Sequence, residues 1–590
     1  MNTYYTAEKH TQILIALLKF HGIKKIIASP GTTNICLLAS LQSDPFFEIY
    51  SSVDERSAAF IAVGLAAESN NPVALVCTGA TASRNYTPGL TEAFYRKLPV
   101  LAITATQHTG RVGTGYSQVI DRSQPLNDIA VESVLVDCVY TKEDEWECEI
   151  NINKALIALR KNGGGPAHIN LVTTYSKDFS VKELPPVKGI RQIEDLSDMP
   201  SLDGYKKIAI LVGNHGKWSQ ALQDSVDTFC EQYNAVVLDY HASNYKGRHG
   251  VNFAIINSMC DYYIAELRDA PLVIYIGGIP RYLSGMKHDS CEMWRINRDG
   301  IIRDPEKMLT RVFAMDEQTF FDYYTAKKPA DENSHESEYA LAWQQEYDKI
   351  IQQTPALPFS NVWVAQNTIT KLPDGCVLHM AGSNTSRAWN FFCLPKSVEC
   401  YSNDGTMGID GQVSALIGES LASPNRLHFG VVGDLTFFYD MNSIGNRHVG
   451  NNLRLIVINN GVGAEFKIYS HPAYRFGEDG NAYMAAAGHY GNKSPELLKH
   501  YAQDLGFEYL CASNKEEYLS NLNKFLDPMP ADRPMLFEVF TDYKDESDAI
   551  YAMNHIVHNM SGSFTSAAKG AIKKILGEKG VETIKKLLNK

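Results

Sequence analysis

Gly433-Asp434-Leu435-Thr436 is the stretch that decides the fold, and Asn459-Asn460 follows it 26 residues later. An apolar run at 429–432 leads into the first cluster, and a second apolar run at 453–458 ends at the asparagine pair. Buried parallel strands that each end in polar residues bring those residues to the same edge of a sheet. The sequence therefore predicts an α/β fold with a polar site at the carboxyl ends of two neighbouring strands.

Three oxygen donors at this edge suit a magnesium ion. Asp434 offers a carboxylate, Asn460 an amide oxygen and Val462 a backbone carbonyl. Mg²⁺ takes a few protein oxygens and completes its shell with water and phosphate oxygens, and the glycines beside these residues let the backbone approach a bulky anion. The same residues also fit two ordinary strand ends with turn residues, and the spacing alone does not separate the two interpretations.

The pattern Gly-Asp and, 26 residues on, Asn-Asn resembles the thiamine diphosphate motif of 2-oxo acid decarboxylases and carboligases. Residues 433–440 have the sequence Gly-Asp-Leu-Thr-Phe-Phe-Tyr-Asp, which is most similar to the branch of this family that makes the menaquinone precursor SEPHCHC. The chain also has features similar to those of acetolactate synthases. The resemblance implies that Asp434 and Asn460 hold the Mg²⁺ that anchors the cofactor's diphosphate. It also implies cofactor contacts by Gly433, Leu435 and Thr436.

Two residues of the N-terminal third match catalytic positions of this family. Glu55 lies within residues 48–67, which predict a strand followed by a helix rich in small residues. In the family a glutamate here contacts N1′ of the aminopyrimidine and promotes loss of the C2 proton, which requires a carboxylate whose pKa burial raises. Gln118 resembles a glutamine that faces cofactor and substrate. Without the resemblance, Glu55 is an acid in a first helical turn, where the helix dipole stabilises it.

Three arginines that bind substrate carboxylates in SEPHCHC synthases have no counterpart here. The corresponding positions hold Thr33, Gln107 and Asp404, and His108 follows the second of them. Arginine forms bidentate pairs with carboxylates that these residue types do not form. We therefore expect little use of isochorismate, and we expect Asp404 to repel a dianionic acceptor if it faces the pocket.

Two further segments match cofactor or substrate positions of the family. Residues 383–387 are Ser-Asn-Thr-Ser-Arg, where the resemblance implies cofactor contacts by Ser383 and Asn384 and a 2-oxo acid carboxylate on Arg387. A surface arginine at a helix start is the alternative for Arg387. Gly405-Thr406-Met407-Gly408 resembles the wedge that keeps the cofactor bent, with Met407 as the wedge and Ile409 as the second choice. An ordinary core methionine is the alternative there.

The composition is that of a globular protein of a reducing compartment. Of the 590 residues, 44% are hydrophobic and 21% charged, the formal net charge is −12, and the eleven cysteines form no Cys-x-x-Cys. A negative chain argues against nucleic acid as a partner, and scattered cysteines argue against a disulfide framework. With no secretory signal pattern and no apolar run of about 20 residues, we expect a cytoplasmic protein.

Polar, proline-containing segments suggest three doubly wound parallel-sheet domains and a tail. The family order implies a pyrimidine-binding domain at 1–185, a central domain at 190–330 and a diphosphate- and Mg²⁺-binding domain at 355–545. Residues 546–590 form a basic amphipathic tail, in which 561–590 carry seven lysines against two glutamates. A helix docked on its own domain, a lid over the active site, and a contact with a membrane surface or partner protein are the alternatives for this tail.

The function that the sequence predicts is thiamine diphosphate-dependent decarboxylation of a small, pyruvate-like 2-oxo acid. The acyl anion equivalent is then transferred to an unknown acceptor carbonyl or released as an aldehyde. One alternative is a SEPHCHC synthase-type 2-oxoglutarate carboligase with an altered pocket, and another is a catalytically silent binding protein of the same fold. The family arrangement implies a homodimer or tetramer with active sites at the subunit interface.

Overall fold

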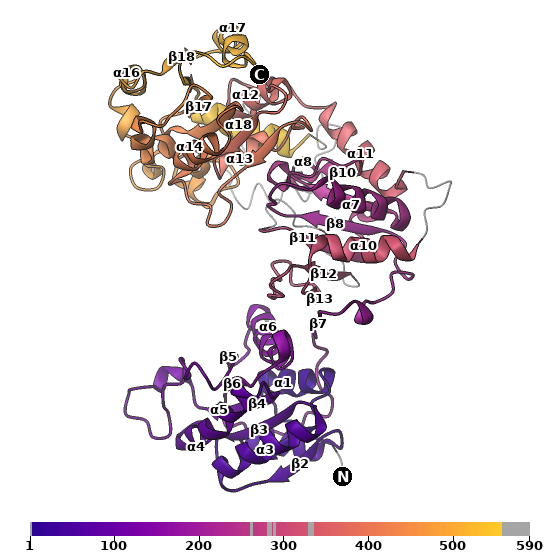
Figure 1. Cartoon of the computed structure of the whole chain (residues 1–590). Helices are drawn as coiled ribbons and strands as arrows, with labels where there is room; N and C mark the ends of the chain where they lie inside the picture. Colours follow the sequence, from indigo (N-terminus) through magenta and orange to yellow (C-terminus); the bar gives the residue numbers. More distant parts are fainter. Residues whose placement is uncertain (1–2, 260–263, 280–285, 287–290, 329–335, 557–590) are drawn as a thin grey trace, which may run out of the picture. The chain divides into compact units, whose positions relative to one another are not determined.

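The computed structural model describes residues 3–259, 264–279, 286, 291–328 and 336–556 (Figure 1). The described strands form three sheets in which neighbouring strands run parallel. By its internal contacts the chain divides into two compact units, residues 1–200 with 292–316, and residues 201–291 with 317–590. Three parallel sheets connected through helices confirm the predicted α/β fold class. Among the described residues, no helix is both long and apolar enough to cross a membrane.

The N-terminal sheet lies in the first unit and has the strand order β2-β1-β3-β4-β6-β5. Its central strands are nearly continuous apolar runs, as expected for a parallel sheet covered on both faces. One buried cluster packs α1 and α6 against the sheet, and a second packs α3 and α5 against it. The strands are β1 (Lys25–Ala28), β2 (Glu48–Ser51), β3 (Val73–Thr78), β4 (Val100–Thr106), β5 (Glu132–Val136) and β6 (Ala167–Val172). The helices are α1 (Lys9–Phe20), α2 (Ile35–Ser43), α3 (Glu55–Ser69), α4 (Thr81–Asn85), α5 (Thr87–Tyr95) and α6 (Lys142–Ala158).

Seven further strands lie in the middle part of the chain, four in the second unit and three in the first. In the second unit the order is β10-β9-β8-β11, and in the first unit it is β12-β13-β7. Trp146 of α6 donates a hydrogen bond to Asp304 at 3.2 Å, which ties residues 292–316 to the first unit. The strands are β7 (Arg191–Ile193), β8 (Ile208–Val212), β9 (Ala235–Asp239), β10 (Gly250–Asn252), β11 (Leu272–Ile276), β12 (Glu292–Ile296) and β13 (Leu309–Phe313). The helices are α7 (Gln220–Tyr233), α8 (Phe253–Ser258), α9 (Ala265–Arg268), α10 (Glu317–Lys327) and α11 (Glu338–Ile351).

The third sheet has the order β15-β14-β16-β17-β19-β18, so the two strands expected from the opening motif are neighbours, as predicted. The strands are β14 (Val377–Met380), β15 (Glu399–Tyr401), β16 (His428–Gly433), β17 (Leu453–Asn459), β18 (Glu508–Ala512) and β19 (Met535–Phe540). The helices are α12 (Asn361–Thr368), α13 (Asn384–Trp389), α14 (Gln412–Ala422), α15 (Asp434–Tyr439), α16 (Leu497–Asp504), α17 (Lys515–Phe525) and α18 (Tyr543–Asn554).

Helix α18 begins at Tyr543 and runs past the expected end of the diphosphate domain at residue 545 to Asn554, packing onto that domain. The buried carboxylate of Glu546 accepts hydrogen bonds from the Asn361 amide, both at 3.0 Å, and burial raises its pKa to about 7. The first part of the expected 546–590 tail is therefore an integral helix of this unit. The basic segment 561–590 lies outside the described residues.

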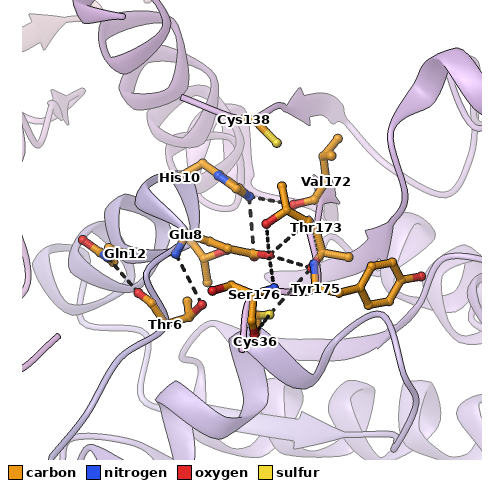
Figure 2. A network of polar contacts seen from close by, with 12 residues as sticks. Thr6, Glu8, His10, Gln12, Cys36, Cys138, Val172, Thr173, Tyr175 and Ser176 are labelled. Atoms are coloured by element: carbon orange, nitrogen blue, oxygen red, sulfur yellow. Dashed lines mark hydrogen bonds and ion pairs between the residues drawn. The ribbon is translucent and has the colours of Figure 1, made fainter. Parts of the chain in front are cut away.

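A buried glutamate anchors the N-terminal segment to the carboxyl end of β6 (Figure 2). Glu8 accepts hydrogen bonds from the Thr173 hydroxyl at 2.9 Å and from the Thr174 amide at 2.8 Å. His10 contacts the Val172 carbonyl at 2.7 Å through Nε2. Burial works to raise the pKa of Glu8, but the hydrogen bonds, those of Thr174 above all, outweigh it, so the pKa lies below its usual value.

Replacing this carboxylate should destabilise the fold in a pH-dependent way. Because the folded pKa is depressed, the charged Glu8 stabilises the fold above its unfolded pKa, and this contribution is lost as pH falls through the folded value. We expect Glu8→Gln to lower the free energy of unfolding by about 1–3 kcal/mol at pH 7, and by less near pH 4. Urea unfolding at both pH values checks this, with exposed Glu48→Gln as the control. A loss for Glu8→Gln that is the same at both pH values would contradict it.

Candidate functional site

The carboxyl ends of β16 and β17 place Asp434 beside the loop that follows Asn460. The two strands pair in register up to Gly433 opposite Ile458. Asp434 is the next residue, is only 5% exposed, and accepts a hydrogen bond from the Gly461 amide at 2.9 Å. Burial raises the pKa of Asp434 to about 7. Within the described part of the chain no cation forms an ion pair with this carboxylate, so a bound cation would offset its desolvation.

The two asparagines of the motif have different surroundings. Asn459 is buried and donates to Glu538 of β19 at 2.6 Å, and Glu538 in turn accepts from the Tyr509 hydroxyl at 2.7 Å. Asn459 is thus a core residue that ties β17 to β19. Asn460 lies just past the strand, half-buried, with its side-chain oxygen accepting from the Val462 amide at 3.3 Å. Of the pair, Asn460 is therefore the one available for a ligand.

The donors at this edge fit a magnesium ion that also binds an anion. Asp434 supplies one charged oxygen, and Asn460 and the Val462 carbonyl supply neutral ones. The structure describes no group of three or more His, Cys, Asp or Glu side chains suited to a metal. A single carboxylate with neutral oxygens is the ligand set of an ion whose remaining ligands are water and phosphate. Sequence reasoning missed Asn492, which steadies the same loop by donating to the Gly461 carbonyl at 2.6 Å.

Arg387 already has a carboxylate partner within the chain. Its two terminal nitrogens donate to the two oxygens of Glu465, each at 3.1 Å, and the Ser383 hydroxyl donates to Glu465 at 2.7 Å. Burial works to raise the pKa of Glu465, but Arg387 and Ser383 outweigh it and keep the pKa below its usual value. Glu465 was not predicted from the sequence, although an acid two residues after Gly463 of the glycine-containing loop is a usable signal.

The residues at the missing-arginine positions are placed differently from one another. Asp404 is buried and accepts hydrogen bonds from the Tyr240 hydroxyl at 2.9 Å, Asn214 at 3.2 Å and Ser402 at 3.0 Å. Thr33 is buried and donates to the Ala105 carbonyl at 2.7 Å. Polar groups of the protein thus already contact both side chains.

Gln107 and His108 lie at the carboxyl end of β4. Gln107 is half-buried and accepts a hydrogen bond from Arg111. His108 is exposed, and its Nδ1 accepts from the Gly110 amide at 3.1 Å. An arginine therefore does lie next to Gln107, although the sequence position itself carries none.

Three of the predicted site residues have a left-handed backbone. Gln118 has φ 59°, Ser383 has φ 63° and Met407 has φ 56°. This region is costly for residues other than glycine, and such strain is concentrated at functional sites. Met407 also leaves 49% of its surface exposed, and Ile409 is exposed as well. An apolar side chain held out of the core is consistent with the predicted wedge rather than with a core methionine.

Glu55 is the first residue of α3, and residues 52–54 connect it to the end of β2. Its side chain is half-buried and accepts a hydrogen bond from Asn85 at 3.3 Å. The single chain therefore leaves this carboxylate partly open to solvent, and the burial expected for it requires a further covering surface.

Comparison with known proteins agrees with this geometry. Residues 8–125 match the family model for the N-terminal TPP-binding domain of thiamine pyrophosphate enzymes. A 2-succinyl-5-enolpyruvyl-6-hydroxy-3-cyclohexene-1-carboxylate (SEPHCHC) synthase of Phocaeicola vulgatus is 31% identical over 94% of this chain and 99% of its own. The chain belongs to the SEPHCHC synthase family. The same-named protein of Bacteroides thetaiotaomicron is 31% identical over 91% of this chain and 97% of its own.

Membership in the SEPHCHC synthase family makes this chain a thiamine diphosphate-dependent enzyme and confirms the resemblance drawn from the sequence. A solved thiamine diphosphate-dependent 4-hydroxybenzoylformate decarboxylase of Rhodococcus jostii RHA1 covers 90% of this chain and 99% of its own. Its sequence identity is 16% and its TM-score 0.40. The roles of the individual site residues and the Mg²⁺ ion stay predictions.

Loss of the Asp434 carboxylate should abolish cofactor retention. Asp434→Ala removes the charged oxygen for Mg²⁺, and the diphosphate then loses its bridging cation. Isothermal titration with thiamine diphosphate, with and without Mg²⁺, should show Mg²⁺-dependent binding in the wild type and none in the variant. Exposed Asp504→Ala is the matched control and should bind like the wild type. Wild-type affinity in Asp434→Ala would exclude this residue as a ligand.

Proposed function

We propose that this protein is a carboligase that decarboxylates a 2-oxo acid of the 2-oxoglutarate type and transfers the remaining acyl unit to an acceptor carbonyl. The observation that carries the proposal is the buried, unpaired Asp434 beside the Asn460 loop, in a chain whose relatives are named SEPHCHC synthases. That name denotes a product with a succinyl group, which 2-oxoglutarate supplies on losing carbon dioxide. The relatives thus support this alternative better than the pyruvate-like activity expected from the missing arginines.

Residues of the chain would bind, activate and support the cofactor. Thiamine diphosphate, when bound, supplies an electron sink at its thiazolium ring. Asp434, Asn460 and the Val462 carbonyl would hold Mg²⁺ against its diphosphate. Glu55 would share a proton with N1′ of the aminopyrimidine. Met407 would support the bent cofactor.

A smaller, pyruvate-like donor is the second candidate, and the Arg387–Glu465 pair favours it. Glu465 neutralises Arg387. If Arg387 faces the distal carboxylate of a dicarboxylic donor, rather than the 2-oxo acid carboxylate expected from the sequence, that carboxylate meets a cation that is already paired. A bidentate pair of this kind also costs binding energy to break. A monocarboxylic donor would avoid that cost.

Competition between donors tests the two candidates. Release of carbon dioxide from 2-oxoglutarate and from pyruvate gives kcat/KM for each, and isochorismate added as acceptor tests the expected weak turnover of that compound. A preference of tenfold or so for 2-oxoglutarate, about 1.4 kcal/mol, supports the first candidate, and the reverse preference supports the second. Glu465→Gln should shift the ratio toward 2-oxoglutarate because it frees Arg387. An unchanged ratio would remove this pair from the argument.

Activation of the cofactor should depend on Glu55. Glu55→Gln keeps the shape of the side chain but cannot share a proton with N1′, so we expect near-normal cofactor binding and C2 proton exchange slowed by about two orders of magnitude or more. Hydrogen–deuterium exchange at C2, read by NMR after acid quench, measures this. Exposed Glu68→Gln on the same helix is the control. Exchange at the wild-type rate in Glu55→Gln would exclude this residue as the activator.

A second copy of the chain would complete the site, so we propose a homodimer, with a tetramer as the alternative. Around Glu55 the large apolar side chains of Val53, Phe60 and Ile61 are exposed, Val53 by 76%. In the second unit Phe466 and Tyr483 are exposed, Tyr483 by 99%. Exposed apolar clusters are features of interfaces, and the predicted desolvation of Glu55 needs such a cover. Light scattering on wild type and Ile61→Glu gives the mass, and a monomeric wild type would refute the proposal.

A further inference from the structure

Arg122 is a buried guanidinium that lies across the carboxyl ends of three strands of the N-terminal sheet. It is only 7% exposed. One terminal nitrogen donates to Asn170 of β6, and the other donates to the Ser83 hydroxyl at 3.4 Å, while Nε makes no hydrogen bond. A Cβ added at Gly79, directly after β3, would come within 2.5 and 2.6 Å of its terminal nitrogens. Glycine at this position thus leaves the space that Arg122 occupies.

No acid neutralises this cation within the described part of the chain. Besides burial, the pKa of Arg122 is affected by the Cys77 thiol, which raises it, and by a second cation, Arg84, which lowers it; no carboxylate is among these influences. Arg84 itself donates to the Asp121 carbonyl at 2.9 Å. Burial, in the first place, lowers the pKa of Arg122 to about 10. A buried charge without a counter-charge is strongly unfavourable, so a bound anion would be stabilised beside Arg122.

A small cavity of about 30 Å³ lies beside the guanidinium. Its polar lining includes Arg122, Arg84, Ser83, Thr104 and His168, and the rest of the wall is largely apolar, with Leu90, Ala102, Pro125 and Ile129. His168 is held between two hydroxyls, with Nε2 at 2.8 Å from Thr104 and Nδ1 at 2.9 Å from Ser133. Burial and then Arg122 lower the pKa of His168 to about 3, so its ring is neutral at pH 7. The cavity therefore offers cationic and neutral hydrogen-bonding groups and no acid.

From this geometry we propose that Arg122, assisted by Arg84, binds a carboxylate group of a substrate. The inference rests on the proposed function and deepens it. Ligands of open α/β sheets bind at the carboxyl ends of the strands, and Arg122 lies directly beside the end of β3 at Gly79. Arg122 follows Gln118 by four residues, and Gln118 is a residue that the family resemblance predicts to face cofactor and substrate. The chain thus carries a carboxylate-binding arginine at a position other than the three now held by Thr33, Gln107 and Asp404.

Anion-dependent stability tests this site without relying on turnover. Melting temperatures of the full-length protein, loaded with thiamine diphosphate and Mg²⁺, are measured with 2-oxoglutarate, pyruvate, isochorismate or inorganic phosphate, for wild type, Arg122→Gln, Arg122→Lys and the exposed control Arg96→Gln. At least one carboxylate should raise the melting temperature of wild type and Arg96→Gln, but not of Arg122→Gln. Without anions Arg122→Gln should be at least as stable as wild type, because it removes an unpaired buried charge.

The pattern of responses identifies the carboxylate. A response to pyruvate and 2-oxoglutarate assigns Arg122 to the 2-oxo acid carboxylate, a response to 2-oxoglutarate alone assigns it to the distal one, and a response to isochorismate alone assigns it to the acceptor. In turnover assays Arg122→Gln should raise KM for that compound roughly 30-fold or more, and Arg122→Lys, which keeps the charge, should recover part of it. Such an effect on KM with little change in kcat is not expected of a purely structural residue.

Other outcomes overturn the proposal. Equal stabilisation of wild type and Arg122→Gln by every carboxylate would remove Arg122 from binding, and a response to phosphate alone would make it a site for an adventitious ion only. If Arg122→Gln does not fold, Arg122→Lys takes its place in the test. An Arg122→Lys variant with the wild-type response of the melting temperature to each acid and the wild-type KM would also remove Arg122 from binding. An Arg122-dependent response without any carboligation would refute the proposed function and leave the anion site standing. Carboligation with the same kinetics in wild type and Arg122→Gln would refute the anion site and leave the proposed function standing.

Discussion

The parallel pairing of β16 with β17 is the constraint on which the site depends. It fixes where each strand ends, so that Asp434 leaves one strand and Asn460 leaves the next on the same edge of the sheet. The hydrogen bond from the Gly461 amide to Asp434 then joins the two loops at 2.9 Å. Asn459 cannot take the place of Asn460, because its side chain is held by Glu538 in the core. A shift of one residue in the register of β17 would turn the Asn459 side chain out of the core and the Asn460 side chain into it.

Burial of charge separates the structural ion pairs of this protein from its candidate ligand sites. The Arg387–Glu465 pair is bidentate and also satisfied by Ser383, so neither group needs a ligand to remain charged. Asp434 and Arg122 are both nine-tenths or more buried, and neither has an opposite charge beside it in the described chain. Desolvation without a partner is the largest unfavourable influence on both. The two sites therefore point to ligands of opposite sign, a cation at Asp434 and an anion at Arg122.

The sequence was sufficient for the parts of the site that depend on local pattern. The apolar runs at 429–432 and 453–458 fall within β16 and β17, and the motif at their ends correctly predicts neighbouring strands. It was not sufficient for contacts between distant segments, such as Arg387 with Glu465, 78 residues apart, or Asp404 with Tyr240, 164 residues apart. Which way a loop side chain points depends on the three-dimensional neighbours that cover it, and no periodicity encodes them. The compact units likewise include residues 292–316 in the first unit, although these residues are far from 1–200 in the sequence.

The missing arginines illustrate the same limit for substrate specificity. Binding of a carboxylate depends on where a cation lies in the folded protein. Residues at different sequence positions can supply that cation. Asp404, expected to repel an acidic acceptor if it faces the pocket, instead accepts hydrogen bonds from Tyr240, Asn214 and Ser402. At the carboxyl ends of β3, β4 and β6, meanwhile, a buried arginine without an acid adjoins a cavity with no acidic group. Loss of arginine at three aligned positions therefore does not by itself remove acidic compounds from the range of substrates, because the charge that would select them is present on a neighbouring segment.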